Sequence, residues 1–166
     1  MLKHLLTPLL IIITATFGTA NAETREERNL RVIRENHQAI LIKTTQGLGV
    51  EFEFNNYKCE NNKGMLGYWS PNERKIVICS KNHVNDAEVR NTIRHEVIHV
   101  AQQCKAKHKG AVALVPQTVF ASDIPAHLYP VEQHQTEAEA RWFANNYGDL
   151  KIAEILVRQC VLNIND

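Results

Sequence analysis

The stretch "DAEVRNTIRHEVIHVAQQCKAK", residues 86–107, predicts one long helix and contains the pattern H-E-x-x-H. Asp86 is a good N-cap residue, and apolar residues follow it at helical spacing. These apolar residues are Val89, Ile93, Val97, Val100 and Ala101. The spacing indicates a helix with one face in the core, so the rest of the fold should assemble around it.

The residues before this helix predict a small antiparallel sheet. Residues 39–54 contain strand-forming residues on both sides of Gln46-Gly47, which is typical of a β-hairpin. These are Ile40 and Ile42, then the alternation Val50, Phe52 and Phe54. Residues 65–70 and 75–79 predict two further strands, joined by the turn "SPNE". We expect three to four antiparallel strands, preceded by a helix over residues 23–38.

Two more helices are predicted after the motif helix. Residues 131–148 have helical character and end at Gly148, while Asp149 can begin a last helix that runs through Leu162. The intervening residues 108–130 contain three prolines and predict an irregular crossing. The expected fold class is therefore α+β: a small antiparallel sheet, the H-E-x-x-H helix and a C-terminal helical pair.

The first 22 residues, "MLKHLLTPLLIIITATFGTANA", resemble a secretory signal peptide. A basic start is followed by an apolar run and an A-x-A ending, which predicts cleavage after Ala22. The apolar run is shorter than the roughly 20 residues that span a bilayer, so no membrane anchor is expected after cleavage. Residues 23–166 have the length of a single domain. We expect a secreted or periplasmic protein.

Charge balance argues against a nucleic-acid or anionic-membrane partner. The sequence has 19 Lys and Arg and 18 Asp and Glu, and loss of the signal peptide removes Lys3 and no acidic residue. The remaining chain thus has as many acidic as basic side chains, and it offers no strongly basic surface for phosphates.

The four cysteines predict two disulfide bonds, because their number is even and the chain is expected to reach an oxidising compartment. We favour Cys59 with Cys79, which lie in one strand-rich segment, and Cys104 with Cys160, which would join two helices. Two other pairings remain open. A zinc site ligated by cysteine is not favoured, because the sequence has no C-x-x-C spacing.

The H-E-x-x-H pattern offers two metal ligands and a base. Residues four apart on a helix point the same way, so His95 and His99 can bind one metal ion. Glu96 projects to the side of that face, where it can reach a water on the metal without filling the coordination shell. Zinc lowers the pKa of such a water towards neutrality, and the carboxylate can take its proton.

A catalytic zinc needs a third protein ligand and an open position. The metzincin continuation is excluded, because Gln102 and Lys105 stand where that class has glycine and histidine. The following segment supplies three candidates: Glu132, His134 and Glu137.

Residues 137–144, with the form E-x-x-A-x-x-F-A, resemble the third-ligand helix of gluzincin metallopeptidases, the superfamily whose type is thermolysin. The resemblance implies a zinc peptidase with one zinc per chain, held by His95, His99 and Glu137, with Glu96 as general base and a peptide or protein as substrate. An Asp or Asn often follows the alanine in those families, whereas this chain has Arg141. Glu139 could orient a ligand histidine or be solvated.

Such peptidases also need an edge strand and a group that supports the oxyanion. "RKIVICS", residues 74–80, is the candidate strand. The candidate oxyanion groups are His127, Tyr129, His134 and Tyr147.

Two hypotheses from other classes stand beside the peptidase. One is a zinc-binding but non-catalytic module, whose site would be closed by a fourth ligand such as His134 or His127. The other is a metal-free, disulfide-stabilised secreted interaction module, in which the histidines belong to the core.

Overall fold

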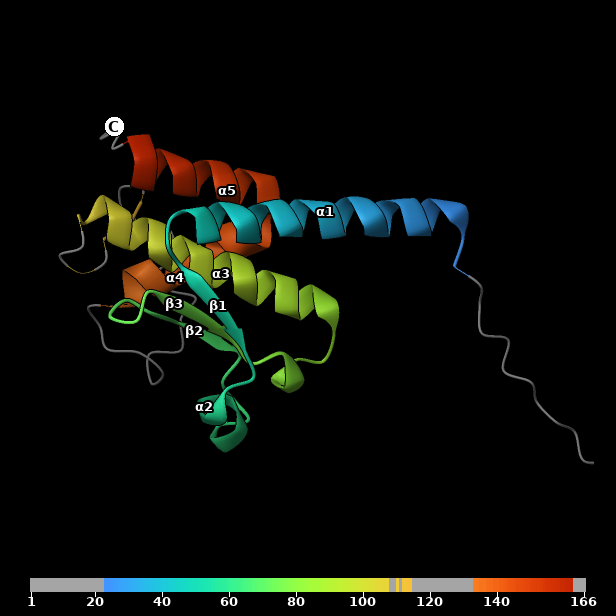
Figure 1. Ribbon diagram of the computed structural model, residues 1–166, viewed down its shortest axis with the longest axis horizontal. Coiled ribbons are helices and arrows are strands. Elements are labelled where there is room, and N and C mark those ends of the chain that lie inside the picture. The colour runs from blue at the N-terminus through green and yellow to red at the C-terminus, as the bar shows by residue number, and fades with distance from the viewer. Residues whose placement is uncertain (1–22, 108–109, 111, 115–132, 163–166) are drawn as a thin grey trace, which may run out of the picture.

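The computed structural model describes residues 23–107, 110, 112–114 and 133–162 (Figure 1). The predicted signal peptide and most of the predicted irregular crossing lie outside these residues. The elements, in chain order, are α1 (Arg25–Gly47), β1 (Glu51–Phe54), α2 (Tyr57–Asn61), β2 (Gly67–Ser70), β3 (Lys75–Ile78), η1 (Ser80–Asn82), α3 (Asp86–Lys105), α4 (His134–Asn146), α5 (Asp149–Val157) and the π-helical turn η4 (Arg158–Leu162). The fold class is α+β, as predicted, with α4 and α5 as the C-terminal helical pair.

Helix α3 lies at the centre of the fold and contacts the sheet, α4 and α5 (Figure 1). Its N-cap is Asn85, one residue before the predicted cap, because the Asn85 side chain accepts a hydrogen bond from the Glu88 amide at 3.0 Å. The buried apolar residues of α3 are Ile93, Val97, Ile98, Val100 and Ala101. They occupy one wide face, as the helical spacing predicted, and they join the main hydrophobic core.

The sheet is mixed and has the strand order β1-β3-β2. β2 pairs with β3 antiparallel, as predicted, whereas β1 pairs with β3 in parallel, in the register Glu51↔Lys75 to Phe54↔Ile78. The parallel pairing differs from the expected antiparallel sheet. The chain leaves β1 through α2 and comes back as the β2–β3 hairpin, so β3 runs in the same direction as β1.

The edge strand is also different from the predicted one. β3 lies in the middle of the sheet with Ile76, Val77 and Ile78 completely buried, so residues 74–80 do not form the edge strand. The two edge strands are β1 and β2, and β2 contacts α3. A completely apolar run is typical of a strand that is covered on both faces, which explains why the central position falls to β3.

Helix α1 is longer than predicted and replaces the first strand of the expected hairpin. It continues through Ile40 and Ile42 to Gly47. Leu41 and Thr45, one helical turn apart, are both fully buried, and α1 packs along α5. The buried residues are four positions apart, which is the spacing of one helix face. The segment is therefore helical, although Ile40 and Ile42 alternate as in a strand. β1 therefore has no hairpin partner and pairs with β3.

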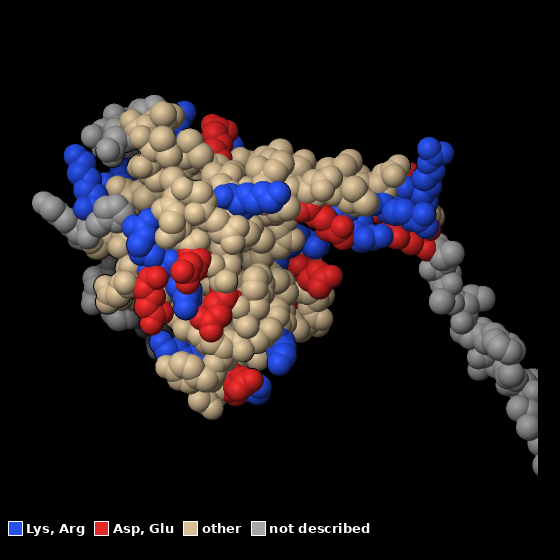
Figure 2. All heavy atoms as spheres, viewed as in Figure 1, with Lys and Arg blue, Asp and Glu red and all other residues tan. Residues whose placement is uncertain are grey.

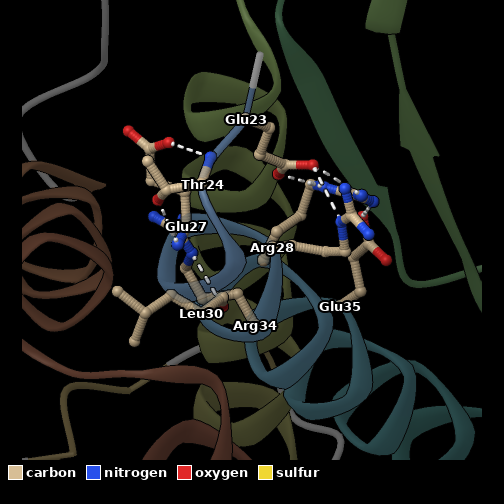
Figure 3. Close-up of polar contacts among 8 residues, drawn as sticks. Glu23, Thr24, Glu27, Arg28, Leu30, Arg34 and Glu35 are labelled. Atoms are coloured by element: carbon tan, nitrogen blue, oxygen red, sulfur yellow. Dashed lines mark hydrogen bonds and ion pairs between the residues drawn. The ribbon is translucent and has the colours of Figure 1, made fainter.

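The start of α1 is stabilised by local polar contacts (Figure 3). Thr24 and Glu27 form a capping box, in which each side chain accepts a hydrogen bond from the other residue's amide, at 3.1 and 2.8 Å. Glu23 forms ion pairs with Arg28 and Arg31.

Acidic and basic side chains are mixed on the visible face of the whole molecule (Figure 2). This agrees with the balanced charge of the sequence.

Both favoured disulfide pairings are confirmed. Cys59–Cys79 joins α2 to the end of β3, and Cys104–Cys160 joins the end of α3 to η4. The second bridge spans 56 positions in sequence, against 20 for the first.

Among the residues that the structure describes, no helix has the length and apolar character to cross a membrane.

Candidate metal centre

The contact between α3 and α4 brings together the three residues predicted as metal ligands. His95 and His99 lie one turn apart on α3, and Glu137 lies in the first turn of α4. The two histidine Nε2 atoms are 3.0 Å apart. The Glu137 carboxylate oxygens lie 3.4 Å from His95 Nε2 and 3.3 Å from His99 Nε2. In the described part of the chain, these three residues form one cluster of potential metal ligands.

The size of this cluster fits a small tetrahedral ion. An ion bound roughly 2.0–2.1 Å from nitrogen and oxygen donors holds those donors about 3.3 Å apart. The two histidine nitrogens are 3.0 Å apart, and each has a different Glu137 oxygen at 3.3 or 3.4 Å. With one donor atom from each residue, the three atoms all lie within 4.8 Å of one another. Two imidazoles and one carboxylate are also a donor set that suits zinc. The residues present therefore fit a zinc ion with three protein ligands.

Gln102 fixes which nitrogen of His99 faces the cluster. The Gln102 side-chain NH₂ group donates to the Thr136 carbonyl at 2.9 Å and to Glu139 at 2.8 Å, and both partners are acceptors. The Gln102 oxygen must then be the atom that lies 2.8 Å from His99 Nδ1, so Nδ1 carries a hydrogen and donates it. The lone pair of a neutral His99 is thereby left on Nε2, the atom that faces Glu137.

Glu139 extends this hydrogen-bond chain into the interior. Its side chain is completely buried, so of the two predicted roles, solvated residue or support for a ligand histidine, the solvated one is wrong. One Glu139 oxygen accepts from Gln102 and from the Leu114 amide at 2.7 Å. It therefore supports His99 through Gln102 rather than directly. The sequence analysis missed Gln102, although its position three residues after His99 places it on the same helical face.

The charges of the cluster reinforce each other. Burial favours the neutral form of Glu137, but hydrogen bonds and charge from His95 and His99 outweigh it and lower the pKa of Glu137 to about 2. Burial likewise disfavours a charged His99, yet the hydrogen bond to Glu137 and the carboxylates of Glu137 and Glu96 raise the pKa of His99 to about 9. The site thus stabilises positive charge between its side chains, and a bound metal cation would take the place of that proton.

Glu96 lies beside the cluster with only 5% of its surface exposed. Burial raises the pKa of its carboxyl group, and opposing contributions come from the two histidines and from a hydrogen bond with the Trp69 backbone amide. That amide belongs to β2, so the edge strand holds the carboxylate in place. The Cys79 amide donates to the Leu66 carbonyl, so these two residues form a hydrogen-bonded pair. In an antiparallel ladder such pairs alternate with pairs that are not hydrogen-bonded, and Gly67 and Trp69 fall in the second kind. Their N–H and C=O groups therefore point away from β3.

Gly67 lets β2 approach α3 closely. A Cβ at this position would lie 2.7 Å from the Thr92 methyl group and 2.9 Å from the Val77 carbonyl oxygen, which is closer than side chains tolerate. The Trp69 indole N–H also donates to Gln103 of α3 at 2.9 Å. These contacts fix the open edge of β2 next to the histidines.

Two cavities meet at the cluster and share Gly67, His95 and Glu96. The first has a volume of about 500 Å³ and extends past Trp69 and Glu137 towards Gln133. The second, about 510 Å³, extends in the other direction over residues of α3 and α4. Together they form a cleft next to β2 with the candidate ligands near its middle.

The other predicted site residues fall into two groups. Glu132, His127 and Tyr129 lie outside the described residues. His134 begins α4 and is not part of the three-residue cluster found among the described side chains. Tyr147 packs its ring against Trp142 and Phe143 and does not line either cavity. The structure thus favours Glu137 over His134 as the third ligand and does not bring Tyr147 to the cleft.

We expect Gln102→Leu to weaken zinc binding about 10- to 100-fold, the range typical when a hydrogen-bond partner of a ligand histidine is lost. Leucine cannot accept the His99 Nδ1 hydrogen, and it leaves the buried Glu139 without one of its donors. Zinc affinity measured by competition with a chromophoric chelator tests this. A matched control is Gln46→Leu at the exposed end of α1, which should keep the wild-type affinity. Equal affinities for the Gln102 variant and the wild type would contradict the orienting role.

Comparison with known proteins finds one family. The family model described as "Domain of unknown function (DUF8637)" matches residues 29–161, which include both histidines, Glu96 and Glu137. No curated protein and no solved structure matches the chain. Since the family model covers most of the sequence, this chain belongs to the DUF8637 family of domains.

Proposed function

We propose that the protein is a zinc-dependent peptidase of gluzincin type that acts as a secreted or periplasmic enzyme. The observation that carries the proposal is the cluster of His95, His99 and Glu137 donor atoms at the middle of a cleft: one donor atom from each residue lies within 4.8 Å of the other two. The two disulfides support an oxidising compartment.

Each residue of the site has a separate task in this proposal. His95, His99 and Glu137 hold the metal, and Gln102 keeps His99 Nε2 directed towards it. Zinc, when bound, supplies a Lewis acid and an acidified water. The Glu96 carboxylate accepts a proton and later delivers it to the leaving amine nitrogen. Glu96 is held in this position by burial and by the hydrogen bond with the Trp69 backbone amide.

The edge strand β2 offers a place for an extended substrate. The outward N–H and C=O groups of Gly67 and the outward C=O group of Trp69 can pair with a peptide backbone, as in other cases where a peptide adds to a sheet edge. The Trp69 N–H is already bonded to Glu96. Such a peptide would pass the cluster with one part in each cavity. A peptide bond is the substrate class that this arrangement suits best.

The two alternative functions have less support. A structural zinc site needs four protein ligands, whereas the described residues supply three, and the cluster borders a cleft. In a metal-free module, the two histidines and Glu137 would only be part of the packed core. That role does not account for the buried Glu96 carboxylate beside them.

Chelation should abolish peptide hydrolysis, and one equivalent of zinc should restore it. The experiment uses the untagged protein without its signal peptide, a mixture of peptides of varied sequence, and mass spectrometry of the products. Metal content by elemental analysis is measured on the same sample. One zinc per chain with no cleavage would favour the non-catalytic zinc module. Absence of zinc binding at near-stoichiometric levels would contradict both zinc-based functions.

A further inference from the structure

The two halves of the cleft differ in charge. The lining of the first cavity, as far as the structure describes it, contains Glu96 and Glu137 but no lysine or arginine. The lining of the second shares Glu96 but lacks Glu137, and it contains one arginine, Arg141, together with the amide side chains of Asn91 and Asn145. A substrate that fills the cleft therefore meets a cation on one side of the metal cluster only.

Arg141 is directed into the second cavity rather than towards the metal cluster. It lies one turn after Glu137 on α4, so an ion pair between these two residues would be expected for a helix surface. Glu137 instead contacts the two histidines, and none of the ion pairs found among the described residues involves Arg141. This is also the position at which the chain departs from the gluzincin pattern. The guanidinium group is thus a half-buried cation with no acidic partner in the described part of the protein.

Two asparagines also line this cavity. The Asn91 side chain donates to Asn145 Oδ1 at 2.7 Å, so the Asn145 NH₂ group is not the group used in this contact. The Asn91 oxygen is buried and accepts no hydrogen bond from the described residues, but it is not accessible from the open cavity.

We propose that this second cavity, the Arg141 subsite, binds a carboxylate of the substrate next to the bond that is cleaved. The inference rests on the proposed peptidase function. Arg141 can bind a carboxylate with two parallel hydrogen bonds, and the Asn145 amide can supply a further donor. The substrate class is therefore an acidic peptide, with the carboxylate of either an Asp or Glu side chain or the chain terminus.

Cleavage of matched peptides tests the subsite. In one set, each position near the cleaved bond carries Glu or Gln; in another, the C-terminus is free or amidated. The zinc-loaded wild type should show at least about a tenfold higher kcat/KM for the acidic member at a single position, the size expected for one charge-assisted hydrogen-bonded pair. A preference confined to the side-chain set identifies Asp or Glu, and a preference confined to the terminus set identifies the chain end.

Variants of Arg141 give the control. Arg141→Gln should remove the preference, and Arg141→Glu should shift it to Lys or Arg at the same position. The matched variant Arg34→Gln alters an exposed arginine on α1, outside both cavities, and should keep the wild-type preference (Figure 3). Binding of a fluorescent acidic peptide to the Glu96→Gln variant, with and without Arg141→Gln, measures the same effect without turnover.

The outcomes separate the two proposals. Cleavage without any acidic preference, or a preference that Arg141→Gln keeps, contradicts the Arg141 subsite and leaves the peptidase function intact. Failure of the zinc-loaded wild type to cleave any peptide contradicts the peptidase function. If the Glu96→Gln variant then also binds acidic and amide peptides equally, the subsite is contradicted on its own measurement.

Discussion

Replacing Glu96 by glutamine should lower kcat for peptide hydrolysis by about 10²- to 10⁴-fold, the usual contribution of a positioned general base. Glutamine has nearly the same shape, and its oxygen can still accept the Trp69 amide hydrogen that the carboxylate accepts. It cannot take a proton. Zinc content should stay at the wild-type level, because Glu96 does not belong to the ligand cluster.

The measurement combines turnover, zinc content and circular dichroism on the same preparation. Glu154→Gln is a suitable control, because it removes an exposed carboxylate on α5 that pairs with Lys151 and is remote from the cleft lining. That variant should have wild-type activity. If Glu96→Gln keeps more than a tenth of the wild-type kcat, another group acts as the base, and Glu96 is only a buried structural residue.

The sequence was sufficient for the parts of the site that depend on local spacing. The two histidines share one face of α3 because they are four residues apart, and this holds in any helix. Glu137 was predicted from the pattern of a later helix, and the structure brings its carboxylate to the histidines. The disulfide pairing also followed from which elements the cysteines occupy.

The elements that were predicted differently depend on long-range packing. Ile40 and Ile42 alternate as in a strand, but the burial of Leu41 and Thr45 against α5, more than 100 residues later, selects a helix. The parallel pairing of β1 with β3 then follows, since β1 has lost its predicted partner. No local pattern contains this information, because it depends on a helix at the other end of the chain.

The hydrogen-bond chain behind His99 was not predicted for a similar reason. In the sequence, Gln102 indicates only a departure from the metzincin pattern. Its role becomes visible when α4 places Glu139 and the Thr136 carbonyl next to its side chain. The role of Gln102 depends on its hydrogen-bond partners, and these lie on a separate helix, α4.

Removal of the Cys104–Cys160 disulfide should lower the free energy of unfolding by about 4 kcal/mol, and removal of Cys59–Cys79 by about 3 kcal/mol. The difference follows from the 56 and 20 positions that the two bridges span, because the longer loop loses more conformational freedom in the unfolded chain. Urea unfolding of the two double Cys→Ala variants measures both values.

The location of the bridges predicts a second difference, in the site itself. Cys104–Cys160 fixes the last turn of α3, the turn after His99, whereas Cys59–Cys79 fixes α2 outside both cavities. Zinc affinity in the folded state should therefore fall more when Cys104–Cys160 is removed. Because α4 also packs along α3, the remaining contacts should keep the site assembled and the loss partial. A larger fall in affinity for the Cys59–Cys79 variant would mean that α2 and β3, rather than the end of α3, set the position of the ligands.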